Sequence, residues 1–149
     1  MTIDEYLNQP RKLKQRAERL WKKAEALEEA AISPQSAGRF DMPRSRSNDN
    51  QTEARLIRYI DAMSEWRDAH DAYVNCRDQL ERDLHNLFYW EGLCIHDVYI
   101  CNAMIDRGDD LTGLEEILNT RNRGAILAKL GEAKQHLRQL LIDQGIEIE

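Results

Sequence analysis

Apolar residues recur every three or four positions along two long stretches of the chain. The first stretch runs to about residue 32 and the second begins near residue 53. Steps that alternate between three and four are the heptad signature of α-helices packed side by side along a narrow seam. The predicted seam residues are Leu13, Ala17, Leu20, Ala24, Leu27 and Ala31 in the first stretch, and Leu56, Tyr59, Met63, Trp66, His70, Tyr73, Arg77, Leu80, Leu84 and Leu87 in the second.

This pattern predicts an all-α protein: a long antiparallel helical hairpin, coiled-coil-like, followed by a small helical C-terminal module. The predicted divisions are a first hairpin helix at 1–32, a flexible polar loop at 33–52, a second hairpin helix at 53–90 and the module at 91–149. The loop is assigned from its Ser, Asn, Pro and Gly content. The same seam also permits a homodimer, and its two polar members, His70 and Arg77, are expected to set register or partner choice.

Helix ends are marked by short local motifs. Thr2 and Glu5 have the spacing of a capping box, in which each side chain accepts a hydrogen bond from the other residue's backbone N–H. Thr112 and Glu115 repeat that spacing and predict a helix that begins near residue 113. Gly145 is the expected stop of the last helix.

The charge is unevenly distributed along the 149 residues, whose net charge is -6. Residues 1–48 carry 10 Lys and Arg against 7 Asp and Glu, residues 49–118 carry 6 against 16, and residues 119–149 carry 5 against 4. The acidic middle segment would repel phosphate, so any contact with nucleic acid must come from an end of the chain. The basic patch Arg11, Lys12, Lys14, Arg16 and Arg19 is expected to pair with the acidic helix across the hairpin, with phosphate binding as the alternative.

No motif of an enzyme, a metal site or a membrane segment is found in the sequence. The N-terminus lacks a basic and apolar signal segment, no apolar run is long enough for a membrane helix, and three cysteines cannot form a closed disulfide framework. These features predict a cytoplasmic protein without membrane contact, cofactor or catalytic activity. The residues considered and set aside are Cys94, His96 and Cys101 as metal ligands, and His85, Glu91, His96 and Asp97 as acid–base groups.

Three segments of the chain resemble one family of small proteins. They are the opening at residues 2–7, the Asp-Met-Pro-Arg-Ser word at 41–45, and the stretch at 57–61. Together they resemble the sigma-factor-region-four-like (ArpU-like) regulatory proteins encoded by phages and prophages of Gram-positive bacteria. The resemblance covers most of residues 1–93 and implies a helical hairpin followed by a DNA-binding domain.

The resemblance further implies a helix-turn-helix in which Thr120 caps a recognition helix. This sequence departs from the family by extra residues at 94–110 and by a short spacing before Thr120, which implies a degenerate motif. The implied function is non-enzymatic regulation of transcription in the cytoplasm of a bacterial host, through DNA or host RNA polymerase. Arginine and asparagine near a helix start can reach base edges, and lysine further along can reach phosphate. The candidate DNA contacts are Arg121, Asn122, Arg123 and Lys129, with Lys134 and Arg138 beyond them.

The alternative is a phage accessory protein that never contacts DNA. Its acidic helix would engage a basic host protein or nucleoprotein complex, for example as an inhibitor of a CRISPR effector. The aromatic Trp90 is a candidate anchor for such a partner, although packing in the core is the more ordinary role. The carboxylates that would replace phosphates are Asp61, Glu65, Asp68, Asp71, Asp78, Glu81 and Asp83.

Overall fold

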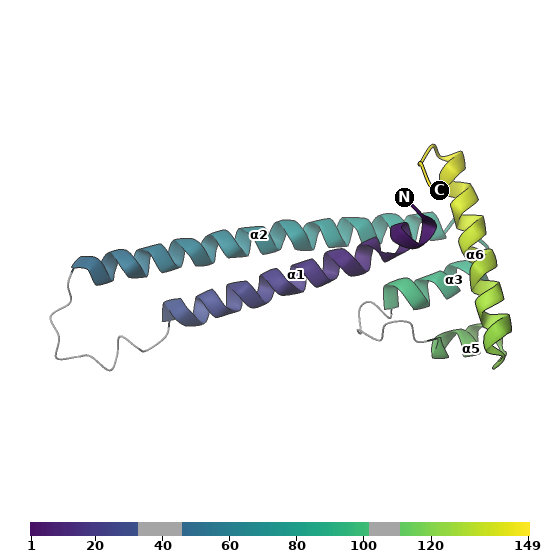
Figure 1. Cartoon of the computed structure of the whole chain (residues 1–149), viewed down its shortest axis with the longest axis horizontal. Coiled ribbons are helices and arrows are strands. Elements are labelled where there is room, and N and C mark those ends of the chain that lie inside the picture. The colour runs from purple at the N-terminus through teal and green to yellow at the C-terminus, as the bar shows by residue number, and fades with distance from the viewer. Residues whose placement is uncertain (33–45, 102–110) are drawn as a thin grey trace. The chain divides into compact units, whose positions relative to one another are not determined.

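The computed structural model describes residues 1–32, 46–101 and 111–149, and every regular element in these residues is a helix (Figure 1). The two long helices pack together as an antiparallel hairpin, so the predicted fold class is confirmed. None of the helices in the described ranges has a stretch long and apolar enough to cross a membrane. The elements in chain order are α1 (Ile3–Ile32), α2 (Arg46–Leu84), α3 (Tyr89–Ile95), the π-helix η2 (His96–Cys101), α5 (Thr112–Leu118) and α6 (Arg123–Asp143).

The chain divides into two compact units. One contains Gln15–Asp71, and the other contains Met1–Lys14 together with Ala72–Glu149. The predicted loop word at 41–45 lies outside the described residues. Each unit is therefore considered separately below.

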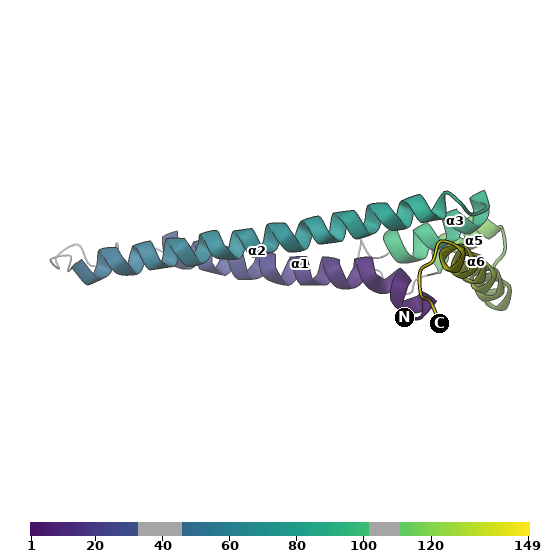
Figure 2. The same ribbon diagram turned by 90° about the horizontal axis from the view of Figure 1, so that it is seen from above.

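In the Gln15–Asp71 unit, α1 and α2 lie side by side in both views (Figures 1 and 2). Four alanines are buried here: Ala17 and Ala24 on α1, and Ala62 and Ala69 on α2. Since these two helices are the only elements described in this unit, each buried alanine must face the other helix. Short side chains at such positions allow two helix axes to approach closely.

Larger residues flank this alanine seam. The indole rings of Trp21 and Trp66 meet with their centroids 4.9 Å apart, and His70 stacks on Trp66 at 5.2 Å. On the polar side, Lys23 Nζ lies 3.6 Å from a Glu65 carboxylate oxygen. This ion pair joins the basic helix to the acidic one, but both side chains are more than half exposed, so it adds little stability.

In α2, part of the predicted seam is displaced by one residue. Met63 and His70 were predicted to lie in the seam, but the buried residues are Ala62 and Ala69 immediately before them, and His70 is exposed. The prediction gave weight to large apolar side chains, whereas closely spaced helices bury small ones. His70 is therefore a neighbour of Trp66 at the edge of the hairpin and does not interrupt the seam.

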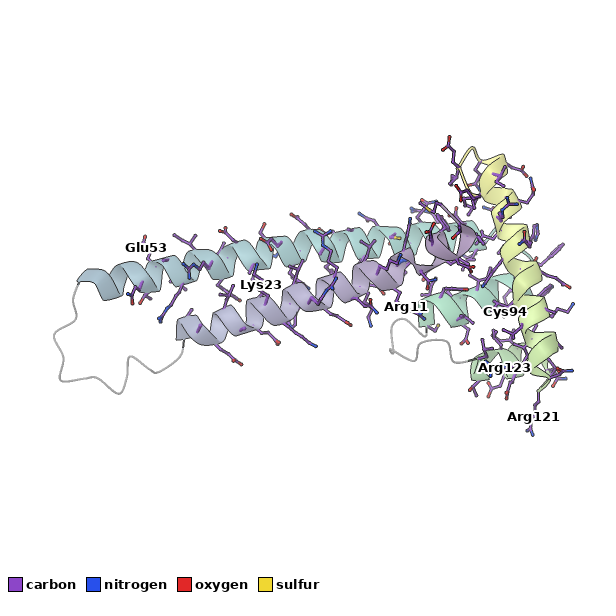
Figure 3. The ribbon with its side chains drawn as sticks, viewed as in Figure 1. Arg11, Lys23, Glu53, Cys94, Arg121 and Arg123 are labelled. Carbon is purple, nitrogen blue, oxygen red and sulfur yellow. The ribbon has the colours of Figure 1, made fainter. Side chains whose placement is uncertain are left out.

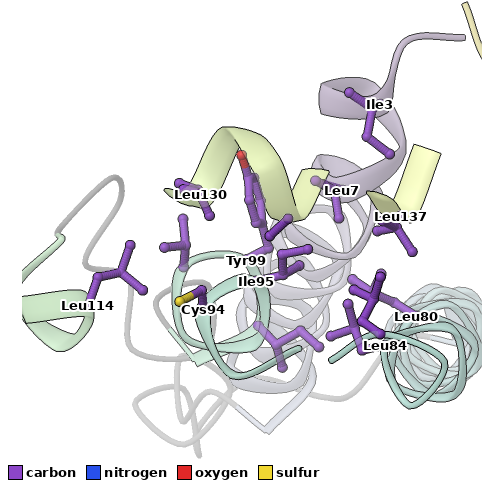
Figure 4. Close-up of a cluster of buried hydrophobic side chains, with 14 of the residues drawn as sticks. Ile3, Leu7, Leu80, Leu84, Cys94, Ile95, Tyr99, Leu114, Leu130 and Leu137 are labelled. Atoms are coloured by element: carbon purple, nitrogen blue, oxygen red, sulfur yellow. The ribbon is translucent and has the colours of Figure 1, made fainter. Parts of the chain in front are cut away.

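The second unit has a continuous apolar core (Figure 4). Leu7 from α1, Leu80 from α2 and Ile95 from α3 are almost completely buried in it, as are Leu114 of α5 and Leu137 of α6. Burial of such side chains stabilises each by roughly 1.5–3 kcal/mol relative to exposure. The small C-terminal helices are thus fixed by packing against the N-terminal turns of α1 and the last turns of α2.

The predicted bounds of the second helix are wrong at both ends. It begins at Arg46, so that residues 46–52 of the predicted loop are helical, and it ends at Leu84 instead of residue 90. Phe88 instead occupies the N-cap of α3, and its backbone N–H donates to Glu91 Oε1 at 3.3 Å. A carboxylate that satisfies a free N–H in this way begins a new helix within the aromatic segment.

Two predicted helix ends are confirmed. The Thr2 N–H donates to Glu5 Oε2 at 2.8 Å, and the Glu5 N–H donates to Thr2 Oγ1 at 3.2 Å. The bond from the Thr2 backbone lowers the pKa of Glu5. At the other end, Gly145 has φ +84°, and the Ile146 N–H donates to Leu141 O at 3.0 Å. This is a Schellman motif, which requires a left-handed residue that glycine adopts without strain.

Candidate nucleic-acid interface

Helices α5 and α6 are joined by a turn of four residues, 119–122. A turn of this length is typical of helix-turn-helix motifs. Leu114 on the first helix and Ile126 and Leu130 on the second are buried. Both helices therefore have their inner faces fixed in the core, and the start of α6 is left exposed.

The geometry of the turn is set by two asparagines. Asn119 has left-handed backbone angles (φ 51°, ψ 43°), which asparagine tolerates better than most residues. Asn122 is the N-cap of α6, and its Oδ1 accepts from the N–H groups of Gly124 (3.0 Å) and Ala125 (3.4 Å). Thr120, expected to cap the recognition helix, instead accepts a hydrogen bond from the Asn122 N–H at 3.3 Å.

This capping changes the role of one predicted DNA contact. Because Asn122 Oδ1 already accepts hydrogen bonds from the first N–H groups of α6, it is not available to accept one from a DNA base. The sequence placed Arg121 and Asn122 within the helix, but α6 begins at Arg123. The cap could have been found from Asn-x-Gly-Ala alone, because asparagine is a favoured N-cap residue.

The two arginines at the start of α6 are exposed. Arg121 projects from this end of α6 into solvent (Figure 3). Within the described residues, neither Arg121 nor Arg123 has an ion-pair partner. Both guanidinium groups are therefore free to contact a phosphate or a guanine edge.

Lys129 is less available than these arginines. Its ammonium lies 3.6 Å from Glu132 Oε2 and 5.2 Å from the centre of the Trp90 ring. A cation over an indole face is attracted by about 0.5–1 kcal/mol at an exposed site. Trp90 itself is half-buried against the core, which is its more ordinary expected role, and the neighbouring Phe88 and Tyr89 are exposed.

The start of α5 lies very close to η2. A Cβ atom placed on Gly113 would be 2.6 Å from Asp97 Oδ1 and 2.7 Å from Asp97 Cγ. Real Cβ atoms essentially never lie this close to another atom. A methyl group at position 113 would force the Asp97 carboxylate to shift, so glycine at this position allows η2 and the start of α5 to lie this close without a rearrangement of Asp97. The sequence analysis did not find this contact, because nothing local connects residues 97 and 113.

The further lysine and arginine of α6 have structural partners. Lys134 Nζ lies 2.9 Å from Asp4 Oδ1 and 5.4 Å from the centre of the Tyr99 ring. Arg138 Nε donates to the Glu149 carbonyl oxygen at 3.1 Å. Among the basic residues of α6 and the preceding turn, Arg121 and Arg123 are therefore the ones left without such partners in the described residues.

The acidic residues of the alternative function fall into two groups. Asp61, Glu65 and Asp68 are exposed and spaced by four and three residues, so they share one face of α2. Asp71 is also exposed, just beyond this face. Asp78, by contrast, belongs to the other unit, where its Oδ1 lies 3.3 Å from the Arg77 guanidinium.

Two further members of that acidic set lie within the second unit. Asp83 is buried, and its two oxygens accept hydrogen bonds from Tyr6 Oη (2.5 Å) and Gln79 Nε2 (3.1 Å). Glu81 Oε1 lies 3.6 Å from His96 Nε2. Asp83 is therefore a structural residue and cannot replace a phosphate in contact with a partner.

A cavity of about 520 Å³ lies between α2 and α3, and its lining includes the polar residues Glu81, His85 and His96. Cys101 Sγ lies 3.2 Å from His96 Nδ1, whose other nitrogen faces Glu81. Burial, and then the nearby charges of Asp97 and Glu81, raise the pKa of the Cys101 thiol. A raised pKa favours the protonated thiol over the thiolate, which is the nucleophilic form.

His136 and Cys94 have structural surroundings. His136 Nδ1 lies 2.8 Å from Oε1 of the buried Glu91, which ties α6 to α3. Burial raises the pKa of Cys94 to about 11. Across the described residues, no group of three or more His, Cys, Asp or Glu side chains is arranged to hold a metal ion.

Comparison of the chain with known protein families, curated proteins and solved structures finds no match.

Proposed function

We propose that this protein is a non-enzymatic regulator of transcription that binds DNA through the helix-turn-helix formed by α5 and α6. The observation that supports it is the four-residue turn at 119–122, which presents Arg121 and Arg123 at the exposed start of α6, where neither has an ion-pair partner among the described residues. Arginines placed at the start of a helix can enter the major groove and bind guanine. The resemblance to ArpU-like phage regulators supports the same function, in the cytoplasm of a bacterial host.

The electrostatics limit the strength of this contact. Glu115 and Glu116 are exposed on α5, close in sequence to the two arginines. A site with about two free cations releases few counterions, so its affinity for nonspecific duplex should be low and its salt dependence shallow. We therefore propose that specific base contacts, or a second contact with host RNA polymerase, supply the rest of the binding free energy.

The test is a salt titration of binding to labelled mixed-sequence duplex DNA, followed by fluorescence anisotropy. Replacing Arg121 and Arg123 by alanine should reduce the slope of log K against log salt by about 2, one unit for each lost phosphate contact. The matched control replaces Arg16 and Arg19, which are exposed on α1, and removes the same charge. If DNA binding is retained when Arg121 and Arg123 are replaced but is lost when Arg16 and Arg19 are replaced, the DNA site lies on α1 instead.

A second function is favoured by the acidic face of α2. Asp61, Glu65 and Asp68 lie along a face that a basic protein could engage in place of phosphates. Under this proposal the chain inhibits a host nucleic-acid-handling complex. This proposal is supported if a basic protein co-purifies from nuclease-treated host lysate with the wild type. That protein should no longer co-purify when Asp61, Glu65 and Asp68 are replaced by Asn, Gln and Asn. Loss of the captured protein after nuclease treatment alone would instead indicate that DNA is the partner.

A further inference from the structure

Helix α2 has a second apolar stripe outside the hairpin seam. Three apolar side chains on it are spaced by four and three residues, so they lie along one side of the helix. Leu56 is 46% exposed and Ile60 is 62% exposed, while Met63 is half-buried. The same spacing continues to Glu53 on one side and to Arg67 on the other. We call the set Glu53, Leu56, Ile60, Met63 and Arg67 the outer stripe.

Exposure of this kind is not ordinary for a solvated helix. Single exposed apolar residues need no explanation, but here Ile57, 53% exposed, widens the stripe into a continuous patch. The opposite edge of the hairpin is polar, where Lys23 pairs with Glu65. The two edges of the hairpin therefore differ in chemistry. One edge is polar, whereas on the other edge the apolar side chains of the outer stripe are not covered by any described residue.

The charges at the ends of the outer stripe determine what can cover it. The outer stripe begins with the acidic Glu53, continues with three apolar residues and ends with the basic Arg67. Ile60 lies midway between the two charged residues. If a second copy of α2 is laid antiparallel and centred on Ile60, each Glu53 lies opposite an Arg67. Ile60 then meets Ile60, Met63 lies opposite Ile57, and Leu56 lies within one residue of Met63 of the other copy along the helix axis. The stripe is therefore complementary to itself in one antiparallel register.

Glu53 and Arg67 cannot satisfy each other within one chain. They are 14 residues apart on a continuous helix, which is about 21 Å of axial rise. In the described part of the chain neither has an ion-pair partner. Glu53 can be located near the start of α2 in Figure 3.

We propose that the outer stripe is a homodimer interface, in which α2 of one copy packs antiparallel against α2 of a second copy. Three apolar side chains per protomer make a small interface, so the dissociation constant should be on the order of micromolar. The interface lies wholly within the Gln15–Asp71 unit. Formation of this dimer requires no DNA, so its test is independent of the test of the proposed function.

The first test is sedimentation velocity of the full chain without DNA, over a concentration series into the high micromolar range. The wild type should show a monomer–dimer equilibrium. Ile60→Glu should raise the dissociation constant at least tenfold, because it places a charge at the centre of the interface. The matched control is Ala54→Glu, which adds the same charge at an exposed position facing away from the stripe. Circular dichroism should show unchanged helix content in both, since each site is exposed.

The second test examines the register by exchanging charges. Glu53→Arg and Arg67→Glu should each weaken the dimer by placing like charges opposite each other, and the double exchange should restore it. Restoration can arise only between copies, given the separation of the two residues in one helix. A wild type that remains monomeric would overturn the proposal and leave the patch to a different protein. A dimer that is insensitive to Ile60→Glu, or a double exchange without recovery, would overturn it as well.

Discussion

Gly113→Ala is the substitution that most directly tests how α5 is placed. The new Cβ would lie 2.6 Å from Asp97 Oδ1 and 2.7 Å from Asp97 Cγ. Gly131 in the middle of α6 provides a control, because a Cβ added there meets nothing within 4 Å. The two changes are chemically identical and both lie on helices. They differ in what the added methyl group contacts and in position, since Gly113 is the second residue of α5 and Gly131 lies within α6.

Two effects of opposite sign determine the result. Alanine is favoured over glycine within a helix by about 1 kcal/mol, and this gain alone should apply at Gly131. At Gly113 the Asp97 carboxylate must retreat from a partly buried position, and insertion of a methyl group into filled space costs about 1–3 kcal/mol. We expect Gly131→Ala to raise the free energy of unfolding by about 0.5–1 kcal/mol and Gly113→Ala to lower it by about 1–2 kcal/mol.

Urea denaturation followed by circular dichroism would measure both changes. In a thermal scan, a chain of this size should show Gly113→Ala as a decrease of about 3–6 °C. The specific cause is tested by repeating the substitution in an Asp97→Ala background. Removing the carboxylate removes the clash, so the same change should become neutral or stabilising, with a coupling free energy of about 2 kcal/mol.

A particular pattern of results would refute this reasoning. If Gly113→Ala stabilises the wild type as much as Gly131→Ala does, η2 and α5 do not approach each other as described. If it destabilises the protein equally with and without Asp97, the cost comes from the backbone and not from the carboxylate. In either case the explanation of how α5 is positioned, and hence how Arg121 and Arg123 are presented, would have to change.

Further predictions concern the buried polar groups. Tyr6→Phe removes a donor from the buried Asp83 and should lower the free energy of unfolding by about 1–3 kcal/mol. Burial and the bond to Asp83 raise the pKa of Tyr6 above 10, so this contribution is complete below pH 10 and is lost at higher pH. The difference between wild type and variant in urea melts should therefore narrow above pH 10; a constant difference would contradict the assignment. His136→Ala should cost about 1–3 kcal/mol because it leaves the Glu91 carboxylate buried without its imidazole partner. Adding Glu91→Gln should recover part of that loss, as measured by a double-mutant cycle.

Features set by neighbouring residues could be predicted from the sequence. Every predicted seam residue of α1 is buried or half-buried, because a single regular repeat faces a single partner helix. The capping box at Thr2 and Glu5 and the stop at Gly145 also form as predicted. In each case the chemistry lies within one helical turn, where spacing alone determines the geometry.

Features set by distant residues could not. The start of α3 depends on Glu91, which is held in turn by His136, 45 residues further along the chain. The placement of α5 depends on the approach of Gly113 to Asp97. The exposure of Arg121 follows from these packing contacts, whereas the cap made by Asn122 is local and could have been predicted. The candidate DNA residues could be named from the sequence, but the long-range partners that engage Lys129 and Lys134 could not.

The error in the α2 seam has a physical explanation in the outer stripe. Leu56 and Met63 were assigned to the hairpin seam because they follow the same three- and four-residue steps as Tyr59 and Trp66. A helix that contacts one partner within the chain and another outside it carries two such stripes, and periodicity alone cannot separate stripes that share a repeat. The alanines identify the closer contact, since only small side chains fit there. Leu56 and Met63 are then among the residues that the proposed dimer buries, so a strictly monomeric protein would leave these two members of the predicted pattern without a cause.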